Sequence, residues 1–540
     1  MPRHILIFAV YMAVSLVTPA FPSSLTLYPV FCNGAVLQRN APIKIWGKGS
    51  EGQAVTVRFA DQTLETTVKD ERWSVVFPAM KAGGPYVLLV QSKDGQIRRQ
   101  DILIGDVWLC GGQSNMETTM RWYVQPNGRT GEKWELFQKV FSGVPGEYQN
   151  NHIRHIKIKI VSSDTPQLEP ELVWSWRNLT PELSMDLSAT AYFFARRLQP
   201  EIGVPVGLVV AALGGTPITA WMPWSVLDSK SLYQPIRTDW EAALAAYPVK
   251  KGKYDEQMAA YRSKYGLKPG DPLGPSWKEA PRIPYGPEHD WRPAGLYNGM
   301  IAPLDGLNFT GIIWYQGEAD TLTPDAVDRY QELFPDLIRQ WRSGLDQPDL
   351  PFLYVQLPSY LRPNSQDRIW PAMRQAQADA RDKVDNAYMT VAIDAGRADD
   401  IHPPFKRVVG ERLARSALAN VYHKISVGSG PRIRGVDFSS DTAEINFSQI
   451  GGGLMIGRLD LTQVVAASSD TRLQGFSLAG QDQKFYPANA VISGVQVILT
   501  SGQVEAPAMV RYAWEDVSPA NLYNREGFPA EPFEARRFGN

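Results

Sequence analysis

The sequence predicts an α/β protein whose central parallel sheet is flanked by small all-β regions. Between about residues 105 and 425, apolar runs typical of buried strands alternate with amphipathic stretches typical of helices, which indicates a parallel sheet with helices on both faces. Residues 21–104 and 426–540 instead hold short alternating segments separated by turn residues, as in small β-sandwiches. The length of 540 residues fits several domains, because one core rarely grows beyond about 300 residues.

The chain begins with a segment that has the features of a signal peptide. Arg3 and His4 precede an apolar run at 5–17 that is too short to cross a membrane, and small residues precede an expected cut after Ala20. No other stretch of the sequence approaches the length of about 18 apolar residues that a span needs. We therefore expect a secreted or periplasmic protein with no membrane span, with an uncleaved anchor as the alternative.

Composition excludes several classes of partner. Lys and Arg number 55 against 56 Asp and Glu, so no basic field exists to hold nucleic acid or an anionic membrane.

Cys32 and Cys110 are the only two cysteines, which are too few for a disulfide scaffold. Cys110 is expected to be a buried free thiol, with a single bridge to Cys32 as the alternative. Aromatic residues make up 11%, which fits either large β-rich cores or rings that stack on sugars.

The three regions are expected to contain the following elements. In the sandwich at 21–104, the turn residues at 93–96 predict a hairpin, and the alternating segments lie at 41–49, 53–69, 73–80 and 85–105. In the central domain at 105–425, strands are predicted at 107–110, 204–215, 309–318, 351–358 and 387–394, and helices at 188–203, 325–345, 370–382 and 403–422. Residues 225–292 interrupt this order with a Pro/Gly-rich insertion, which is either a lid or a decoration. The region at 426–540 is predicted to be a second small sandwich or a jelly-roll piece.

Ser114 lies behind two glycines, directly after the predicted strand at 107–110. Open α/β sheets keep their chemistry at the carboxyl ends of their strands, so Ser114 is a candidate nucleophile, with a helix cap as the alternative. The glycine pair Gly214 and Gly215 and the stretch at 314–320 follow other predicted strands and are expected to reach the same crevice. A serine needs a base to take its proton, and a histidine held by a third group is the usual base.

Among the six histidines, His402 has the best surroundings for this role. It follows a predicted strand, and Asp399, three residues earlier in a turn, can reach back to one ring nitrogen while the other nitrogen faces the crevice. Asp400 is the alternative orienting acid. His152 and His155 begin a strand, fit surface or structural roles, and are too sparse for a zinc site without further ligands.

The developing oxyanion needs hydrogen-bond donors near the nucleophile. The backbone N–H of Ser114, a glycine N–H at Gly214 or Gly215, and the side chain of Gln316 are suitable. Glu318 is expected to belong to a buried network that orients these loops, and it is also kept among the substrate-binding candidates.

Taken together, these stretches resemble the SGNH-hydrolase superfamily and, within it, the sialate O-acetylesterase family of carbohydrate esterases. The resemblance covers most of the mature chain and follows the family's order. It starts with "VFCNGAVLQRNAPIKIWG" before a nucleophile block, "GDVWLCGGQSNME", and a glycine block, "LGGTPITAW". The later blocks are "LYNGMIAPL" with "GIIWYQGEAD", "WPAMRQAQ" and "DDIHPP".

The resemblance implies a flavodoxin-like three-layer α/β/α hydrolase domain flanked by β domains. It also implies hydrolysis of acetyl esters on sugars without a metal or another cofactor. Ser114 would be the nucleophile, His402 the general base and Asp399 the orienting acid. Gly215 and Gln316 would complete the oxyanion hole with Ser114. The superfamily's third block typically supplies an Asn to this hole, so the use of Gln316 would be particular to this branch.

The sequence leaves the substrate open. We expect an acetylated carbohydrate, with O-acetylated sialic acid first, and acetylated xylan or pectin, or a non-catalytic glycan-binding role, as alternatives. An Arg clamp on a sialate carboxylate would favour the first, and Arg121, Arg292 and Arg374 are candidates. Trp221 and Trp224 follow the glycine block and either line the substrate pocket or belong to the core.

Overall fold

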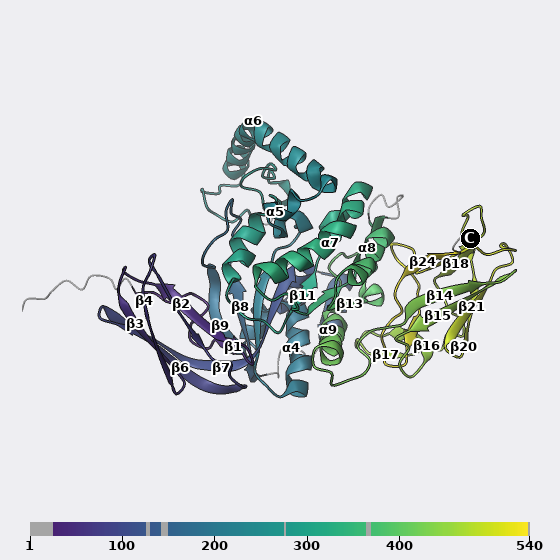
Figure 1. Cartoon of the computed structure of the whole chain (residues 1–540). Coiled ribbons are helices and arrows are strands. Elements are labelled where there is room, and N and C mark those ends of the chain that lie inside the picture. Colours follow the sequence, from purple (N-terminus) through teal and green to yellow (C-terminus); the bar gives the residue numbers. More distant parts are fainter. Residues whose placement is uncertain (1–24, 126–129, 142–148, 275–276, 363–368, 538–540) are drawn as a thin grey trace, which may run out of the picture.

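A computed structural model describes residues 25–125, 130–141, 149–274, 277–362 and 369–537. The expected signal peptide at 1–20 lies outside the described residues. Figure 1 shows three parts in a row: an N-terminal β region, a central α/β region and a C-terminal β region. The predicted fold class is confirmed.

The central region contains a parallel sheet in the order β13-β12-β11-β7-β10-β8, with β9 antiparallel at the edge. Its strands are β7 (Gly95–Gly112), β8 (Asn150–Ile158), β9 (Leu172–Leu179), β10 (Val206–Ala212), β11 (Gly311–Tyr315), β12 (Phe352–Val355) and β13 (Ala387–Thr390). Every residue of β10 and β11 is buried, which explains why the sequences of these strands are continuous apolar runs.

Helices cover both faces of this sheet and complete a three-layer arrangement. Helices α7 (Pro324–Gly344) and α8 (Ile369–Lys383) pack together above the sheet in Figure 1, and α4 (Ala189–Ile202) and α9 (Lys406–Asn420) pack together below it. Helix α4 begins where Ser188 Oγ accepts from Ala191 N at 3.2 Å, and it ends at Gly203 with φ of +68°. The predicted helix at 188–203 rested on helical spacing and on this glycine, and the structure adds the cap at Ser188.

The remaining short helices lie mostly in the loops between strands and helices. They are α1 (Ser114–Glu117), α2 (Met120–Val124), α3 (Glu132–Phe141), η1 (Leu183–Asp186), η2 (Ile218–Trp221), η4 (Trp277–Glu279), η5 (Tyr297–Ile301), η6 (Ala302–Leu304), η7 (Glu318–Thr321) and η8 (Ile393–Ala395). No helix in the described part of the chain is long and apolar enough to cross a bilayer.

The N-terminal region shares strand β7 with the central sheet. Its strands are β1 (Val36–Gln38), β2 (Ile43–Lys48), β3 (Ala54–Phe59), β4 (Gln62–Thr67), β5 (Arg72–Phe77) and β6 (Gly83–Ser92). The first half of β7 pairs with β6 through the predicted hairpin at 93–96, and the second half pairs with β10 and β11. The boundary predicted after residue 104 therefore falls inside one strand. A Cβ on Gly105 would lie 2.2 Å from Pro205 O, so glycine permits a close backbone approach within β7.

The segment at 225–292 projects at the top of Figure 1. It begins within α5 (Trp224–Leu227), includes η3 (Ser231–Tyr233) and has as its longest element α6 (Gln234–Lys264), a single helix that continues through Pro248. Only Trp240, Ala243 and Tyr261 of α6 are buried, so most of this helix faces outward.

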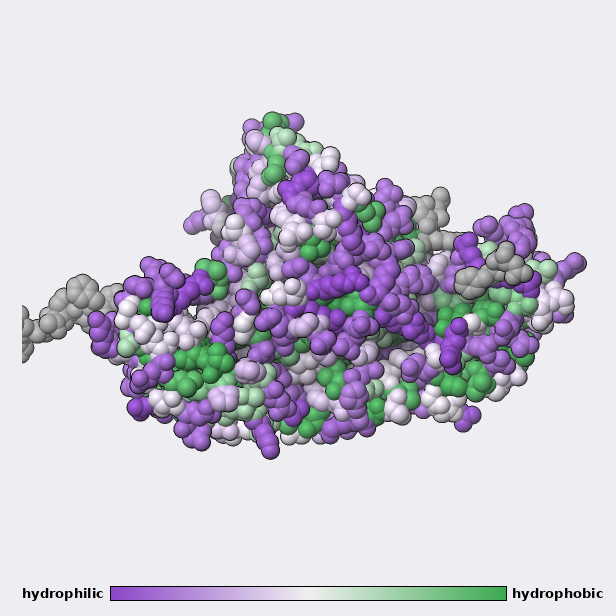
Figure 2. Space-filling model, viewed as in Figure 1, coloured by the Kyte–Doolittle hydropathy of each residue, from purple (hydrophilic) through white to green (hydrophobic). Residues whose placement is uncertain are grey.

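The C-terminal region builds its own antiparallel sheets, in the orders β14-β15-β21-β20, β17-β16-β23 and β19-β18-β22-β24. Its strands are β14 (Arg432–Phe438), β15 (Thr442–Ser448), β16 (Leu454–Leu459), β17 (Val465–Ala467), β18 (Phe476–Ala479), β19 (Tyr486–Pro487), β20 (Asn489–Ser493), β21 (Gln496–Thr500), β22 (Met509–Tyr512), β23 (Leu522–Asn524) and β24 (Phe533–Arg536). Figure 2 shows a largely hydrophilic face, with hydrophobic side chains gathered mainly over the two β regions. Both cysteines are free thiols, and Cys110 is buried as expected.

Candidate active site

The loops that follow β7, β10 and β11 meet at one edge of the sheet. Leu213 N donates to Gly112 O at 3.1 Å, and Gln113 N donates to Tyr315 O at 2.9 Å. Gly112 has φ of +133°, and a Cβ there would lie 2.2 Å from Tyr315 O, so this position needs glycine. The nucleophile, glycine and third sequence blocks are therefore brought together as the parallel order predicts.

Ser114 is the first residue of α1 and is half-buried. Gln113 occupies the N-cap position, and no side chain caps this helix, so capping does not account for the serine. The backbone of Gly214 lies against it, because a Cβ on Gly214 would be 3.2 Å from Ser114 Cβ. Glu117 fixes this approach by accepting from Gly214 N at 2.7 Å.

The three predicted oxyanion donors differ in their surroundings. In the described part of the chain, neither the Ser114 N–H nor the Gly215 N–H has a protein acceptor, and Gly215 is exposed with φ of +73°. Gln316 is instead fully buried, and its amide donates to Thr216 O at 3.1 Å and to Asp320 Oδ2 at 2.5 Å. The two backbone donors are available for a substrate, whereas Gln316 would first have to release a bond.

Asp320 ends the stretch "GIIWYQGEAD", the third block, and connects it to neighbouring loops. Its Oδ2 also accepts from Ile218 N at 2.9 Å, which ties this block to η2. Burial raises the pKa of Asp320 to about 7, although the hydrogen bonds from Gln316 and Ile218 favour the charged form. Gln113 Oε1 accepts from Ala319 N at 3.2 Å and connects the same block to the nucleophile turn.

Trp221, a candidate for substrate binding, has no exposed surface. Its ring packs edge-on against Trp314, and its indole N–H donates to Thr216 Oγ1 at 2.9 Å. This position is that of a core residue, the alternative that the sequence left open. Trp224 is half-buried, and the guanidinium of Arg237 from α6 lies 3.9 Å from its ring centroid.

The loop that carries His402 reaches the nucleophile turn. Asn115 Nδ2, one residue after Ser114, donates to Ile401 O at 3.1 Å across a sequence separation of 286. Asp399 is exposed, and Arg397 donates to its two oxygens at 2.9 Å each. Asp400 is buried, and its Oδ1 accepts from His402 N at 3.0 Å.

Asn115 also contacts two buried charged residues, Glu318 and Lys406. Asn115 Nδ2 also donates to Glu318 Oε1 at 2.5 Å, and Lys406 Nζ donates to Asn115 Oδ1 at 2.5 Å. Burial raises the pKa of Glu318 and lowers the pKa of Lys406 to about 7. Glu318 is only 5% exposed, so it holds loops together, as the network interpretation expected, and offers little surface to a substrate. Sequence reasoning missed Asn115 and Lys406, although Lys406 falls on the apolar stripe that 409, 413 and 417 continue along α9.

The other predicted residues lie in different surroundings. His155 is buried in β8, where burial lowers its pKa to about 4, and His152 is exposed. Arg374 is fully buried and donates to four backbone carbonyls, those of Leu357, Pro358, Glu515 and Asp516. Arg121 is paired with Asp186, and Arg292 with Asp164. All three arginines are engaged with protein acceptors.

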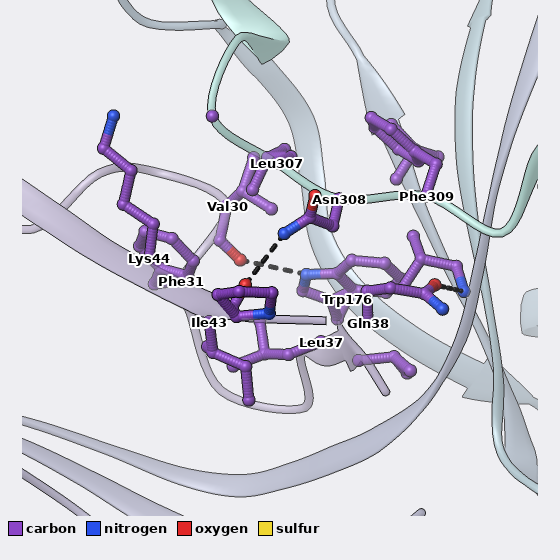
Figure 3. Close-up of a pocket in the computed structure, with 15 residues that line it drawn as sticks. Val30, Phe31, Leu37, Gln38, Ile43, Lys44, Trp176, Leu307, Asn308 and Phe309 are labelled. Atoms are coloured by element: carbon purple, nitrogen blue, oxygen red, sulfur yellow. Dashed lines mark hydrogen bonds between the residues drawn. The ribbon is translucent and has the colours of Figure 1, made fainter. Parts of the chain in front are cut away.

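A small cavity lies at the junction of the N-terminal and central regions (Figure 3). It measures about 30 Å³, and Trp176 Nε1 donates to Val30 O beside it at 3.0 Å, while Asn308 Nδ2 donates to Pro42 O at 2.8 Å. It has room for about one water molecule, so it is a packing gap and not a substrate site. Among the described residues, no group of three or more His, Cys, Asp or Glu is placed to hold a metal ion.

Comparison with known proteins now identifies the family. A solved carbohydrate acetylesterase from Xanthomonas citri is 31% identical, covers 95% of this chain and 100% of its own, and superposes with a TM-score of 0.75. The chain belongs to the sialate O-acetylesterase family of carbohydrate esterases. The sialate O-acetylesterases of Rattus norvegicus and Homo sapiens are each 28% identical over 93% of this chain and over 93% and 91% of their own lengths.

The family assignment fits the position of the site. The family model "Carbohydrate esterase, sialic acid-specific acetylesterase" matches residues 287–419, a range that includes Gln316, Glu318 and His402. Ser114 lies outside that range. This member of the sialate O-acetylesterase family is accordingly a carboxylic-ester hydrolase of the SGNH type, and the family chemistry is the removal of O-acetyl groups from sugars.

Proposed function

We propose that this esterase removes O-acetyl groups from sialic acid through an acetyl-enzyme on Ser114. The observation that carries the proposal is the bond from Asn115 to Ile401, because it joins the residues that adjoin Ser114 and His402 at the carboxyl edge of the sheet. The names of the curated relatives support sialic acid as the sugar.

In the first half-reaction, Ser114 Oγ attacks the acetyl carbonyl while His402 takes the hydroxyl proton. The negative charge on the carbonyl oxygen is met by the N–H groups of Ser114 and Gly215, and one such donor is worth about 10²–10³-fold in rate. Gln316 can join them only by exchanging its bond to Thr216 or Asp320. The C–O bond to the sugar then breaks, and His402 returns the proton to the departing sugar hydroxyl.

In the second half-reaction, water attacks the acetyl group on Ser114 while His402 takes a proton from it. The ester bond to Ser114 breaks, the proton returns to Oγ, and acetate leaves. Asp399 is proposed to orient the imidazole, with Asp400 as the alternative. Comparing Asp399→Asn with Asp400→Asn separates them: the orienting acid is the one whose loss lowers kcat by about 10⁴-fold.

A second substrate class is favoured by one specific observation. A sialate carboxylate calls for an Arg fork, and Arg121, Arg292 and Arg374 are all engaged with protein acceptors. Neutral acetylated polymers such as xylan need no such fork, and the solved relative from Xanthomonas citri carries only the broader name carbohydrate acetylesterase.

The deciding experiment measures acetate release from O-acetylated sialic acid, acetylated xylan, acetylated pectin and a small aryl acetate. Ser114→Ala is expected to abolish release from every substrate, whereas Ser225→Ala, which alters an exposed serine in α5, leaves it unchanged. Release from sialate alone supports the first proposal, and release from plant polymers alone moves the substrate to the second. Full activity of Ser114→Ala would refute the nucleophile.

Secretion is proposed from the N-terminal segment. The mature protein recovered from its native host is expected to begin at Phe21, which N-terminal sequencing checks. Recovery of a chain that still begins at Met1 in the membrane fraction would favour the uncleaved anchor.

A further inference from the structure

Lys406 is buried beside the site without a described role in the reaction. Its side chain is 1% exposed, which is rare for lysine, and it begins α9 four residues after His402. Its Nζ lies 5.7 Å and 5.5 Å from the ring centroids of Tyr123 and Tyr315. Its hydrogen bond goes to the neutral amide of Asn115 and not to a carboxylate.

The amide of Asn115 can face two ways, and Lys406 is one of the three partners that select the observed orientation. An amide offers one acceptor oxygen and two N–H donors, and an ammonium only donates. Because Lys406 Nζ faces Oδ1, Nδ2 faces the opposite side, where it donates to Glu318 Oε1 and to Ile401 O. A reversed amide would set donor against donor at Lys406 and oxygen against oxygen at Glu318.

We infer that Lys406 is a positioning residue for the reaction: it helps to fix the orientation of the Asn115 amide, which in turn holds the turn of Ser114 against the loop of His402. This inference rests on the proposed roles of those two residues. Every atom in the chain of contacts from Lys406 to Ile401 is within hydrogen-bond distance, so the positioning needs no long-range effect.

The hydrogen bond from Lys406 to Asn115 does not depend on the charge of the lysine. Burial lowers the pKa of Lys406 to about 7, and the neighbouring carboxylates of Glu318 and Asp400 oppose that shift. Both the ammonium and the neutral amine carry N–H donors, and Ile401 O can only accept, so the amide keeps its orientation and its bond to Lys406 on either side of neutral pH. Only removal of the donor, and not its titration, should release the amide.

The test compares Lys406→Met with Arg407→Met on the small aryl acetate. Methionine keeps the length of Lys406 without a donor, and Arg407, one residue along the same helix, is 42% exposed and paired with Glu411. Active sites are counted with a serine-directed phosphonate, so that kcat refers to folded enzyme. We expect kcat of Lys406→Met to fall by about 10²-fold with KM nearly unchanged, because misplaced reacting groups cost rate and not binding. Arg407→Met should match the wild type.

A double-mutant cycle with Asn115→Ala separates positioning from general packing. If Lys406 acts through Asn115, Lys406→Met adds little once Asn115 is gone, whereas independent effects would multiply. Should Lys406→Met give no phosphonate-labelled enzyme, Lys406→Leu, which also lacks a donor, takes its place in the same cycle. Multiplying effects, or a Lys406→Met enzyme as fast as Arg407→Met, would overturn the inference.

The Ser114→Ala variant distinguishes a failure of the inference about Lys406 from a failure of the proposed function. Activity in Ser114→Ala would remove the nucleophile and both ideas with it. An inactive Ser114→Ala together with an unaffected Lys406→Met would leave the acetyl-enzyme standing and remove only the role of Lys406.

Discussion

The N-terminal and C-terminal β regions are joined to the hydrolase sheet in different ways. Strand β7 runs without interruption from the N-terminal region to the nucleophile turn, so the two share one backbone hydrogen-bond ladder. The C-terminal sheets are separate and are tied to the centre largely by side chains, among them Arg374 to Glu515 O and Tyr523 to Asp394. A flanking region that shares a strand is expected to unfold with the catalytic sheet, whereas one held by side chains can be loosened by itself.

The largest effect is expected from breaking the shared strand. Gly105→Ala places a Cβ 2.2 Å from Pro205 O in the middle of β7, and we expect a loss of about 4 kcal/mol or more in unfolding free energy, or no folded protein. The matched control is Gly435→Ala in β14, where a Cβ meets nothing within 4 Å and the change should stay within about 0.5 kcal/mol. Denaturant unfolding followed by phosphonate labelling of Ser114 measures both. Equal stabilities of the two variants would contradict the shared-ladder account.

The second effect is a dependence of the unfolding free energy on pH, which we expect from the titration of Asp320. Burial raises the pKa of Asp320 to about 7 from an ordinary value of 3.8, so the folded protein binds a proton there that the unfolded chain releases. Stability from this group is therefore present below about pH 4 and is lost as pH rises through 7, by an amount on the order of 4 kcal/mol. In Asp320→Asn this loss should vanish, which unfolding curves at pH 4 to 8 check. An identical pH slope in the variant would mean that Asp320 is ionised throughout.

A smaller effect is expected where the C-terminal region is attached. Arg374→Met leaves four buried carbonyls without their donor, and we expect a cost of about 2 kcal/mol. Hydrogen exchange should increase in the C-terminal strands and not in β7 or β10. Exchange that rises equally in β7 would show that the C-terminal region is not an independent unit.

The smallest effect is expected at the exposed edge of the same interface. Arg432 and Asp382 form an ion pair with side chains 35% and 56% exposed, so Arg432→Met should cost less than about 1 kcal/mol. Thermal unfolding beside Arg374→Met checks this ranking. A larger loss for Arg432→Met would reverse the account of which contacts hold the region.

The sequence was informative wherever a local rule governs the outcome. Helical spacing and the terminal Gly203 predicted α4, and the parallel strand order brought Ser114, Gly214 and Gln316 to one edge. The domain boundary was expected after residue 104 because the pattern of segments changes there, and that pattern does not show that a single strand, β7, runs across it. The bond between Asn115 and Lys406 joins residues far apart in the chain, and periodicity alone marks Lys406 only as a buried position.

The acetyl-enzyme on Ser114 is the central claim, and trapping it is the most direct test. The protein is mixed with the aryl acetate, quenched in acid during the first turnover, digested and analysed by mass spectrometry. The account predicts one acetyl group on the peptide that contains Ser114, absent from Ser114→Ala and unchanged in Ser225→Ala. An acetyl group on another residue in proportion to turnover, or full turnover by Ser114→Ala, would contradict it.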